Sequence, residues 1–135
     1  MYNEAESLQT LITLLEEVEG TRVTLIGDVM LDRYHHGYAN NLNSTAPVPA
    51  LRVIYSEESP GAAAHIARGL SSLGLSVDLH SSVGDDNEGK CIINTLRKDG
   101  IDTSGIIEVE GRNTLTKIRF YGSRENLLDQ EQILL

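Results

Sequence analysis

The sequence predicts an α/β fold in which helices flank a parallel β-sheet. Between residues 22 and 110, apolar strand patterns alternate with helix patterns in the order strand, helix, strand, helix, strand, which is typical of parallel sheets. A later segment, residues 114–123, alternates strictly between two faces, as a half-buried strand does. We therefore expect a main parallel sheet and a separate, smaller group of strands outside it.

The first elements are a helix over residues 5–18 and a buried strand over residues 22–27. The helix carries apolar residues at three-and-four spacing and is stopped by Gly20. Its apolar face consists of Leu8, Leu11, Ile12, Leu15 and Val18.

A polar, Asn-rich loop is expected after Tyr34, followed by an extended run over residues 48–55. Pro47 and Pro49 flank the start of this run, and proline cannot donate a hydrogen bond to a β-ladder. The run is therefore predicted to be an edge or flap strand.

The next helix is predicted over residues 59–74, with Ser59 and Pro60 at its start and Gly74 at its end. A strand over 75–84, a helix over 85–100 opened by acidic residues, and a strand over 105–110 follow. The alternating segment 114–123 is expected to pair with the 48–55 run. The apolar face of the 59–74 helix is expected to consist of Ala63, Ile66, Ala67, Leu70 and Leu73.

Composition limits the possible functions. The chain has 135 residues, which suits one domain, and a net charge of −9, which repels nucleic acids and anionic membranes alike. A single cysteine, Cys91, cannot form an internal disulfide and is expected to pack inertly in a reducing compartment. The N-terminus lacks the cationic region of a signal peptide, and no apolar run could span a membrane. We expect a cytoplasmic protein.

Several kinds of site are not supported by the sequence. It contains neither a P-loop nor a dinucleotide-binding glycine motif. His35 and His36 are adjacent, so a strand would direct them to opposite faces, and no metal site is predicted. Aspartyl-phosphate phosphatases need two acids spaced two residues apart after a strand, whereas Asp28 and Asp32 are four apart.

Three features could nevertheless bind a ligand. Asp28 and Asp32 follow the first strand, where open α/β sheets collect ligands, and a carboxylate there can accept hydrogen bonds from sugar hydroxyls; a turn-forming Asp is the simpler alternative. Gly61 lies at a helix start, where free N–H groups meet polar ligands, although an ordinary helix start is the simpler alternative. Lys117 and Arg119 suit a phosphate, or form a solvated strand face.

The order and wording of the motifs GDVMLDRY, APVP, PGAAA and TLTKIR resemble the ribokinase-like, PfkB-type carbohydrate kinases, in particular the heptose-7-phosphate kinase domain of ADP-heptose synthesis enzymes. The resemblance runs from Arg22 to Arg124. It implies a partial, Rossmann-like kinase fold with a small β-sheet lid over the substrate, built from segments about 34–55 and 115–122. It also implies that Asp32 holds sugar hydroxyls, that Gly61 faces the sugar, and that Asp28 orders the turn.

The chain departs from the pattern of that family at several positions. Ala62 and His65 stand where the family usually has a glycine and an asparagine, and both would crowd the sugar and change its hydrogen bonds. Asn43, with Asn41 and Ser44, replaces the residues expected before APVP. We expect Asn43, Ala62 and His65 to belong to the substrate site, so these changes bear on which sugar is bound.

The resemblance also implies a missing half. Such kinases carry the catalytic base, the anion hole and the ATP site in a second half, so residues 1–135 are expected to be a single partial domain with no catalytic residue of its own. ATP and Mg²⁺ would serve the complete enzyme, and neither is expected to bind this chain tightly. The alternatives are, from a different class, a non-catalytic regulatory or assembly module that keeps the kinase half-fold, and an unrelated flavodoxin-like binding domain in which the strands 47–55 and 115–122 would lie inside the main sheet. Open strand edges predict a homo-oligomer formed through the lid or a sheet edge.

Overall fold

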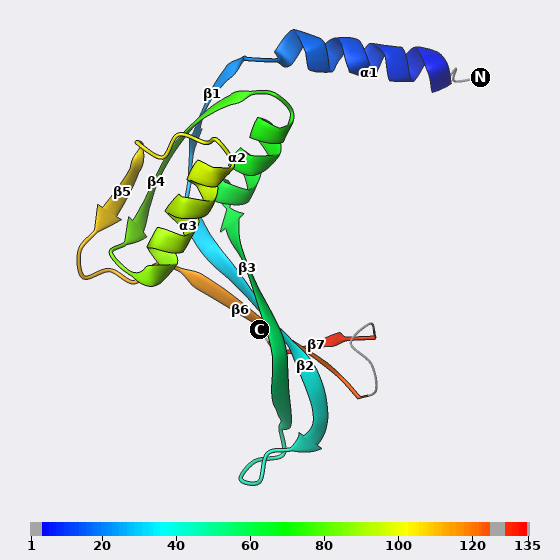
Figure 1. Cartoon of the computed structure of the whole chain (residues 1–135), viewed down its shortest axis with the longest axis vertical. Helices are drawn as coiled ribbons and strands as arrows, with labels where there is room; N and C mark the ends of the chain where they lie inside the picture. Colours follow the sequence, from blue (N-terminus) through cyan, green and yellow to red (C-terminus); the bar gives the residue numbers. More distant parts are fainter. Residues whose placement is uncertain (1–3, 125–128, 135) are drawn as a thin grey trace.

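The computed structural model describes residues 4–124 and 129–134, which form two β-sheets (Figure 1). A parallel sheet has the order β1-β4-β5, with β1 at Arg22–Ile26, β4 at Ser76–Gly84 and β5 at Ile106–Val109. A mixed sheet has the order β3-β2-β6-β7, with β2 at Val29–Leu42, β3 at Pro49–Ala62, β6 at Thr116–Ser123 and β7 at Glu131–Leu134. The predicted α/β class, with a second group of strands outside the parallel sheet, is confirmed.

Three helices accompany these sheets: α1 at Glu4–Val18, α2 at Ala63–Ser72 and α3 at Asn87–Lys98. The helices α2 and α3 lie on the same face of the parallel sheet, whereas α1 projects away from it (Figure 1). None of the helices in the described part of the chain has the length and apolar character that crossing a bilayer requires.

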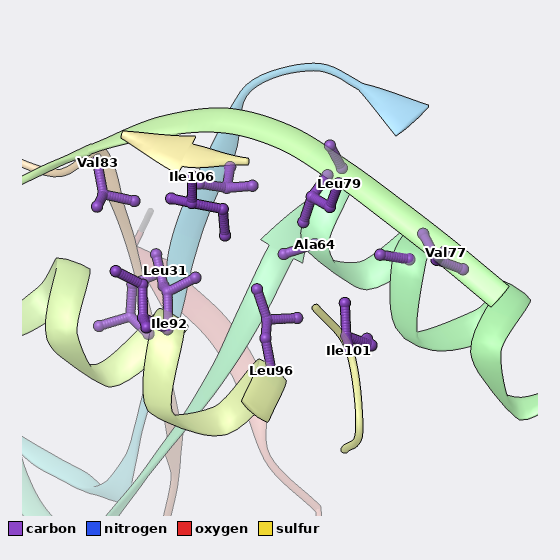
Figure 2. Packing of buried hydrophobic residues seen from close by; sticks show 13 residues of the cluster. Leu31, Ala64, Val77, Leu79, Val83, Ile92, Leu96, Ile101 and Ile106 are labelled. Atoms are coloured by element: carbon purple, nitrogen blue, oxygen red, sulfur yellow. The ribbon is translucent and has the colours of Figure 1, made fainter. Parts of the chain in front are cut away.

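The core lies between the parallel sheet and the two helices α2 and α3 (Figure 2). Leu79 of β4 and Ile92 and Leu96 of α3 are fully buried there. The aliphatic composition explains why this layer can pack closely without large aromatic side chains.

Strand β2 connects the core to the mixed sheet. Its first residues belong to the core, where Val29 and Leu31 are buried, and the strand pairs with β3 from Val29 onward and with β6 from Leu31 onward as it leaves the core. The β2–β3 hairpin extends far beyond the parallel sheet (Figure 1). One strand therefore belongs to both parts of the fold.

The predicted pairing of the 48–55 run with residues 114–123 is wrong. Both segments are strands of the mixed sheet, but β2 lies between them: β3 pairs with β2 antiparallel and β6 pairs with β2 parallel. The predicted loop after Tyr34 is in fact the continuation of β2 to Leu42, and this long strand supplies the ladder that separates the other two. The separate sheet also excludes the flavodoxin-like alternative, which required these strands in the parallel sheet.

The helix predicted from Ser59 begins four residues later, at Ala63. Residues 59–62 instead pair with Asp32, Leu31, Met30 and Val29 in the β2–β3 ladder. Pro60 is compatible with this because β3 is an edge strand, where a missing N–H is tolerated. Ladder pairing therefore overrides the local preference for a helix start.

The buried face of α2 also differs from the prediction. Ala63, Ala64 and Ala67 are buried, whereas Ile66 and Leu73 are about half exposed. A methyl group on Gly27 would lie 3.1 Å from the Cβ of Ala63. Ala63 and Ala67 are buried as predicted and Leu70 packs against the core, whereas Ala64 was not expected there. The small alanine side chains allow the helix to approach the end of β1 closely.

The predicted glycine stops after α1 and α3 and the acidic start of α3 are confirmed. Gly20 and Gly100 follow α1 and α3 with φ of +73° and +75°, the conformation that glycine adopts at least cost. Asp86 caps α3 by accepting a hydrogen bond from the N–H of Gly89 at 2.8 Å. It also accepts bonds from the N–H and hydroxyl of Thr114, each at 2.7 Å, and these bonds hold the pKa of Asp86 below its ordinary value.

Candidate functional site

One face of the mixed sheet gathers polar and aromatic side chains. Asp32, Tyr34 and His36 alternate along β2, and the parallel register sets them opposite Lys117, Arg119 and Tyr121 of β6, respectively. Residues that face one another across a ladder project from the same side of a sheet. This face therefore combines an acid, two basic groups and several rings.

Asp32 is the centre of this arrangement. Its Oδ1 accepts a hydrogen bond from Nη1 of Arg119 at 2.8 Å, and both side chains are largely buried, with 18% and 19% of their surfaces exposed. The guanidinium of Arg119 also lies 5.0 Å from the centre of the Tyr34 ring, within cation–π range. The hydrogen bond to Asp32 is the main cause that raises the pKa of Arg119, so this guanidinium stays charged.

Gly61 approaches the other oxygen of this carboxylate. It lies opposite Met30 in the β2–β3 ladder, and a Cβ at this position would overlap Oδ2 of Asp32. Only glycine lets the backbone pass here without displacing the acid. The carboxylate of Asp32 thus lies between the guanidinium of Arg119 and the backbone of Gly61, which has no side chain.

Ala62 has a strained backbone. Its φ of 53° and ψ of −127° make it the one non-glycine residue with positive φ in the described ranges 4–124 and 129–134. This conformation lets the chain turn from β3 into α2, and the N–H of Ala63 then donates to the carbonyl of Asp28 at 3.0 Å. An alanine here carries a steric cost that a glycine would not.

The structure brings Asp32, Gly61 and Arg119 into one cluster, with Ala62 next to Gly61 and Lys117 beside Asp32 in the register. The remaining two predicted substrate residues, His65 and Asn43, lie elsewhere.

His65 is exposed on α2 and lines a separate hollow with Arg68 and Asp99. Asn43 is in the turn between β2 and β3, where its Oδ1 accepts hydrogen bonds from the N–H and hydroxyl of Thr45, both at 3.0 Å. Asp28 contributes to the turn from β3 into α2 through its backbone carbonyl, which accepts a hydrogen bond from the N–H of Ala63.

An aromatic ladder on the same face was missed by the sequence analysis. His36 stacks between Tyr55 of β3 and Tyr121 of β6, with ring centres 4.6 and 5.2 Å apart and ring planes within 9° of parallel. Nδ1 of His36 also bonds to Oε1 of Gln130. The sequence does show ring-bearing residues at alternate positions of β2. The stacking of His36 between Tyr55 and Tyr121, however, depends on how β2, β3 and β6 are aligned.

His35 projects from the opposite face, as predicted for adjacent strand residues. It packs against Phe120, with ring centres 5.1 Å apart, and its Nδ1 lies 2.7 Å from the hydroxyl of Ser56. No group of three or more His, Cys, Asp or Glu side chains that could hold a metal ion is found among the residues with described positions.

Arg33 anchors the mixed sheet to α3. Its Nε donates to Glu58 of β3 at 2.6 Å and its Nη2 to Glu88 of α3 at 3.1 Å. The hydrogen bond to Glu58, followed by that to Glu88, raises the pKa of Arg33. Sγ of Cys91 lies 3.5 Å from Glu58, and burial is the main cause that raises the pKa of this thiol. Cys91 thus stays protonated and contributes packing at this joint.

Comparison with known proteins identifies the family. The family model described as pfkB family carbohydrate kinase matches residues 21–129. The chain belongs to this family. All the residues of the Asp32 cluster lie within the matched range.

Curated relatives of this pfkB-family chain are long proteins. It is 39% identical over 115 residues to the bifunctional protein HldE of Hyphomonas neptunium, covering 85% of the chain and 24% of that protein. It is 38% identical over 112 residues to the bifunctional protein HldE of Haemophilus influenzae, covering 83% of the chain and 23% of that protein. The chain thus spans about a quarter of the length of these relatives.

Solved structures confirm the fold of the pfkB-family chain. A nucleoside kinase of Methanocaldococcus jannaschii, an archaeal member of the ribokinase family, superposes with a TM-score of 0.62 at 24% identity, covering 85% of this chain and 36% of that one. A sugar kinase of Pyrococcus horikoshii, determined in complex with ATP, superposes with a TM-score of 0.56 at 27% identity, covering 83% of this chain and 33% of that one. The parallel and mixed sheets are therefore those of a ribokinase-like kinase, in part.

Proposed function

We propose that this chain is the sugar-binding and lid half of a carbohydrate kinase, with the mixed sheet as the lid. The observation that carries this proposal is the Asp32 cluster: a largely buried carboxylate fixed between Arg119 and the backbone of Gly61. An ionised carboxylate can accept about four hydrogen bonds. After binding Arg119, Asp32 keeps acceptor capacity for the hydroxyls of a sugar.

The surrounding residues suit a phosphorylated sugar. Lys117 lies beside Asp32 on the same face of the lid, so it can attract the phosphate of a sugar phosphate while Asp32 holds the hydroxyls. Arg119 neutralises Asp32 and fixes its orientation, which lowers the cost of ordering the site on binding. His65, Ala62 and Asn43 remain proposed substrate residues, with Ala62 the nearest of them to Gly61 along the chain.

The complete enzyme is proposed to transfer the γ-phosphate of Mg-ATP to a hydroxyl of a sugar or sugar phosphate, in the cytoplasm. Phosphoryl transfer depends on groups that position the nucleophile and stabilise charge around the γ-phosphate. We assign those groups to the part of the enzyme beyond this chain, which spans only about a quarter of its curated relatives. The chain alone is expected to release no ADP from ATP and heptose or hexose phosphates. ADP release that Asp32→Ala abolishes would contradict this assignment.

Calorimetry tests the sugar site directly. Titrating the chain with heptose 7-phosphate and with hexose phosphates should give a saturable heat for at least one of them. The variant Asp32→Asn should lose this heat, because the amide presents one acceptor oxygen and no charge to the hydroxyls. Glu110→Gln, which removes a charge from an exposed turn, is the matched control and should bind as the unaltered chain does. Equal heats from both variants would exclude Asp32 as the sugar acceptor.

A second candidate is a non-catalytic regulatory or assembly module that keeps the kinase half-fold. The specific observation in its favour is that Asp32 already has an ionic partner in Arg119, while Ala62 and His65 replace the smaller or differently bonding residues of the family pattern. This candidate predicts no saturable heat with any sugar phosphate, in either the unaltered chain or the Asp32 variant.

Self-association through the lid is part of the proposal. The strand β3 is an open edge, and an apolar hollow of about 420 Å³ between β3, β6 and β7 is lined by Leu51, Phe120 and Ile133, among others. Val53→Lys places a charge on this edge strand, at a side chain that is 46% exposed. Sedimentation should then show weaker association than in the unaltered chain. An unchanged sedimentation profile would exclude the β3 edge as the contact.

A further inference from the structure

The helix α1 takes no part in the site and lies outside the residues that match the family model, which begin at residue 21. It has no buried residue, and no element of the described chain packs along it. It projects from the start of β1, away from both sheets (Figure 1). The surface that covers this helix therefore lies outside the described part of the chain.

A helix of this kind needs a partner. Isolated helices shorter than about 12–15 residues are marginal in water, and α1 has 15 residues of which none is buried and only Val18 is partly covered. Five large aliphatic side chains on α1 are between 43% and 61% exposed. Both the helical conformation and the cost of exposing these side chains favour a bound state in which the apolar surface is covered.

The spacing of the apolar residues indicates what covers them. Leu8, Leu11, Leu15 and Val18 follow one another at intervals of three, four and three residues, which is the seam of a coiled coil. The positions that flank this seam carry no charge within the helix: they are Ala5, Ser7, Ile12 and Leu14. The acids Glu6, Glu16 and Glu17 occupy the positions farther from the seam, and Glu4, the first residue of the helix, lies one seam position before Leu8. Two such seams can meet over residues 8–18 without bringing like charges together.

We propose that α1 packs seam to seam against α1 of a second copy of this chain. A membrane surface is a poor alternative, because α1 has no Lys or Arg to attract anionic lipids and its polar face is acidic. A single helix surface that is self-complementary in both shape and charge is what a two-fold dimer requires.

The pairing is antiparallel. Each subunit has a net charge of −9, and each body is joined to α1 by only residues 19–21. Parallel helices would bring the two bodies to the same end of the pair, whereas antiparallel helices separate them by the helix length of about 22 Å. In this arrangement Leu8 lies opposite the partner's Val18 and Leu11 opposite the partner's Leu15, so all four seam positions are filled.

Sedimentation of a seam variant tests the contact. Leu11→Glu places a carboxylate in the seam and should weaken dimerisation by about a hundredfold or more, because an unpaired charge is costly in an apolar interface. Thr10→Glu adds the same charge one residue away, on the outer side, and is the matched control. It should dimerise as the unaltered chain does. Both variants are made in the Val53→Lys chain, so that any association through the β3 edge does not obscure the result.

Mixing two variants tests the orientation. Leu11→Glu and Leu15→Lys should each be monomeric alone and should form a heterodimer together, since residue 11 faces the partner's residue 15 only in the antiparallel pair. Leu11→Glu mixed with Leu11→Lys should stay monomeric. The seam proposal is overturned if Leu11→Glu sediments like Thr10→Glu, or if the Val53→Lys chain shows no dimer at any concentration. The orientation is overturned if only the second mixture associates. None of these outcomes depends on sugar binding.

Discussion

Replacing Ala62 with glycine should stabilise the protein, although glycine usually destabilises. Ala62 has φ of 53° and ψ of −127°, where a Cβ is in steric conflict with the backbone. A glycine at this position would adopt the same backbone without that conflict, and it would keep the hydrogen bond from the N–H of Ala63 to the carbonyl of Asp28, because the turn itself does not change. The substitution therefore isolates the cost of one methyl group.

The magnitude follows from two opposing effects. Holding a non-glycine residue in such a region costs about 1–3 kcal/mol. Glycine also lowers the free energy of unfolding by about 0.4–1 kcal/mol, because it increases the conformational freedom of the unfolded chain. The free energy of unfolding should thus rise by about 0.5–2 kcal/mol. With a urea m-value of about 2 kcal/mol per molar, a gain of about 1 kcal/mol moves the unfolding midpoint up by about 0.5 M.

Urea unfolding of three chains provides the assay. Ala50 is an exposed residue of β3 with ordinary strand backbone, so Ala50→Gly should lower the free energy of unfolding by about 0.5–1 kcal/mol. The two Ala-to-Gly substitutions should therefore shift the urea midpoint in opposite directions at an unchanged m-value. If Ala62→Gly lowers the midpoint as Ala50→Gly does, the reasoning from backbone strain is refuted.

Three further predictions follow from other contacts. Gly61→Ala should displace the carboxylate of Asp32 and weaken any sugar binding at least tenfold by calorimetry, while an unchanged affinity would show that the close approach is unimportant. Asp86→Ala removes a helix cap and should cost about 1–2 kcal/mol in urea unfolding near neutral pH. Because the pKa of Asp86 in the folded state is below its ordinary 3.8, this difference should persist above about pH 4 and disappear as the pH falls further; a constant difference would contradict the role of its charge. Arg33→Met should speed amide hydrogen exchange in the β2–β3 hairpin but not in β4, and equal rates in the hairpin would rule out Arg33 as its anchor.

Much of the fold could be predicted from local patterns. The order of strands and helices identified the parallel sheet, and Gly20, Gly100 and the acids before α3 located helix ends because capping depends on nearby residues. The helix start at Ala63 was missed because residues 59–62 are held in a ladder by a strand about thirty positions earlier in the chain. Local preference carries no information about such a distant partner.

The site was predictable in its residues but not in its contacts. Asp32, Gly61 and Arg119 were all singled out from the sequence, yet their direct contact depends on β2 lying between β3 and β6, which no pattern within one strand reveals. The stacking of His36 between Tyr55 and Tyr121 was missed for the same reason. Residue types can be read from one segment, whereas pairing across strands requires the register of several.

The continuity of β2 has a mechanical consequence. A flap carried on a loop can swing while the body stays still, but β2 is one strand from the buried Leu31 to Leu42, with register shifts against β3 at His36/Gly37 and Tyr38/Asn41. Bending β2 near its base would disturb the packing of the core. The outer part of the strand is therefore mechanically coupled to the core side chains at its base. A displacement of the tip of the β2–β3 hairpin should change the packing of the hydrophobic core. A change in core packing should likewise shift the position of the tip.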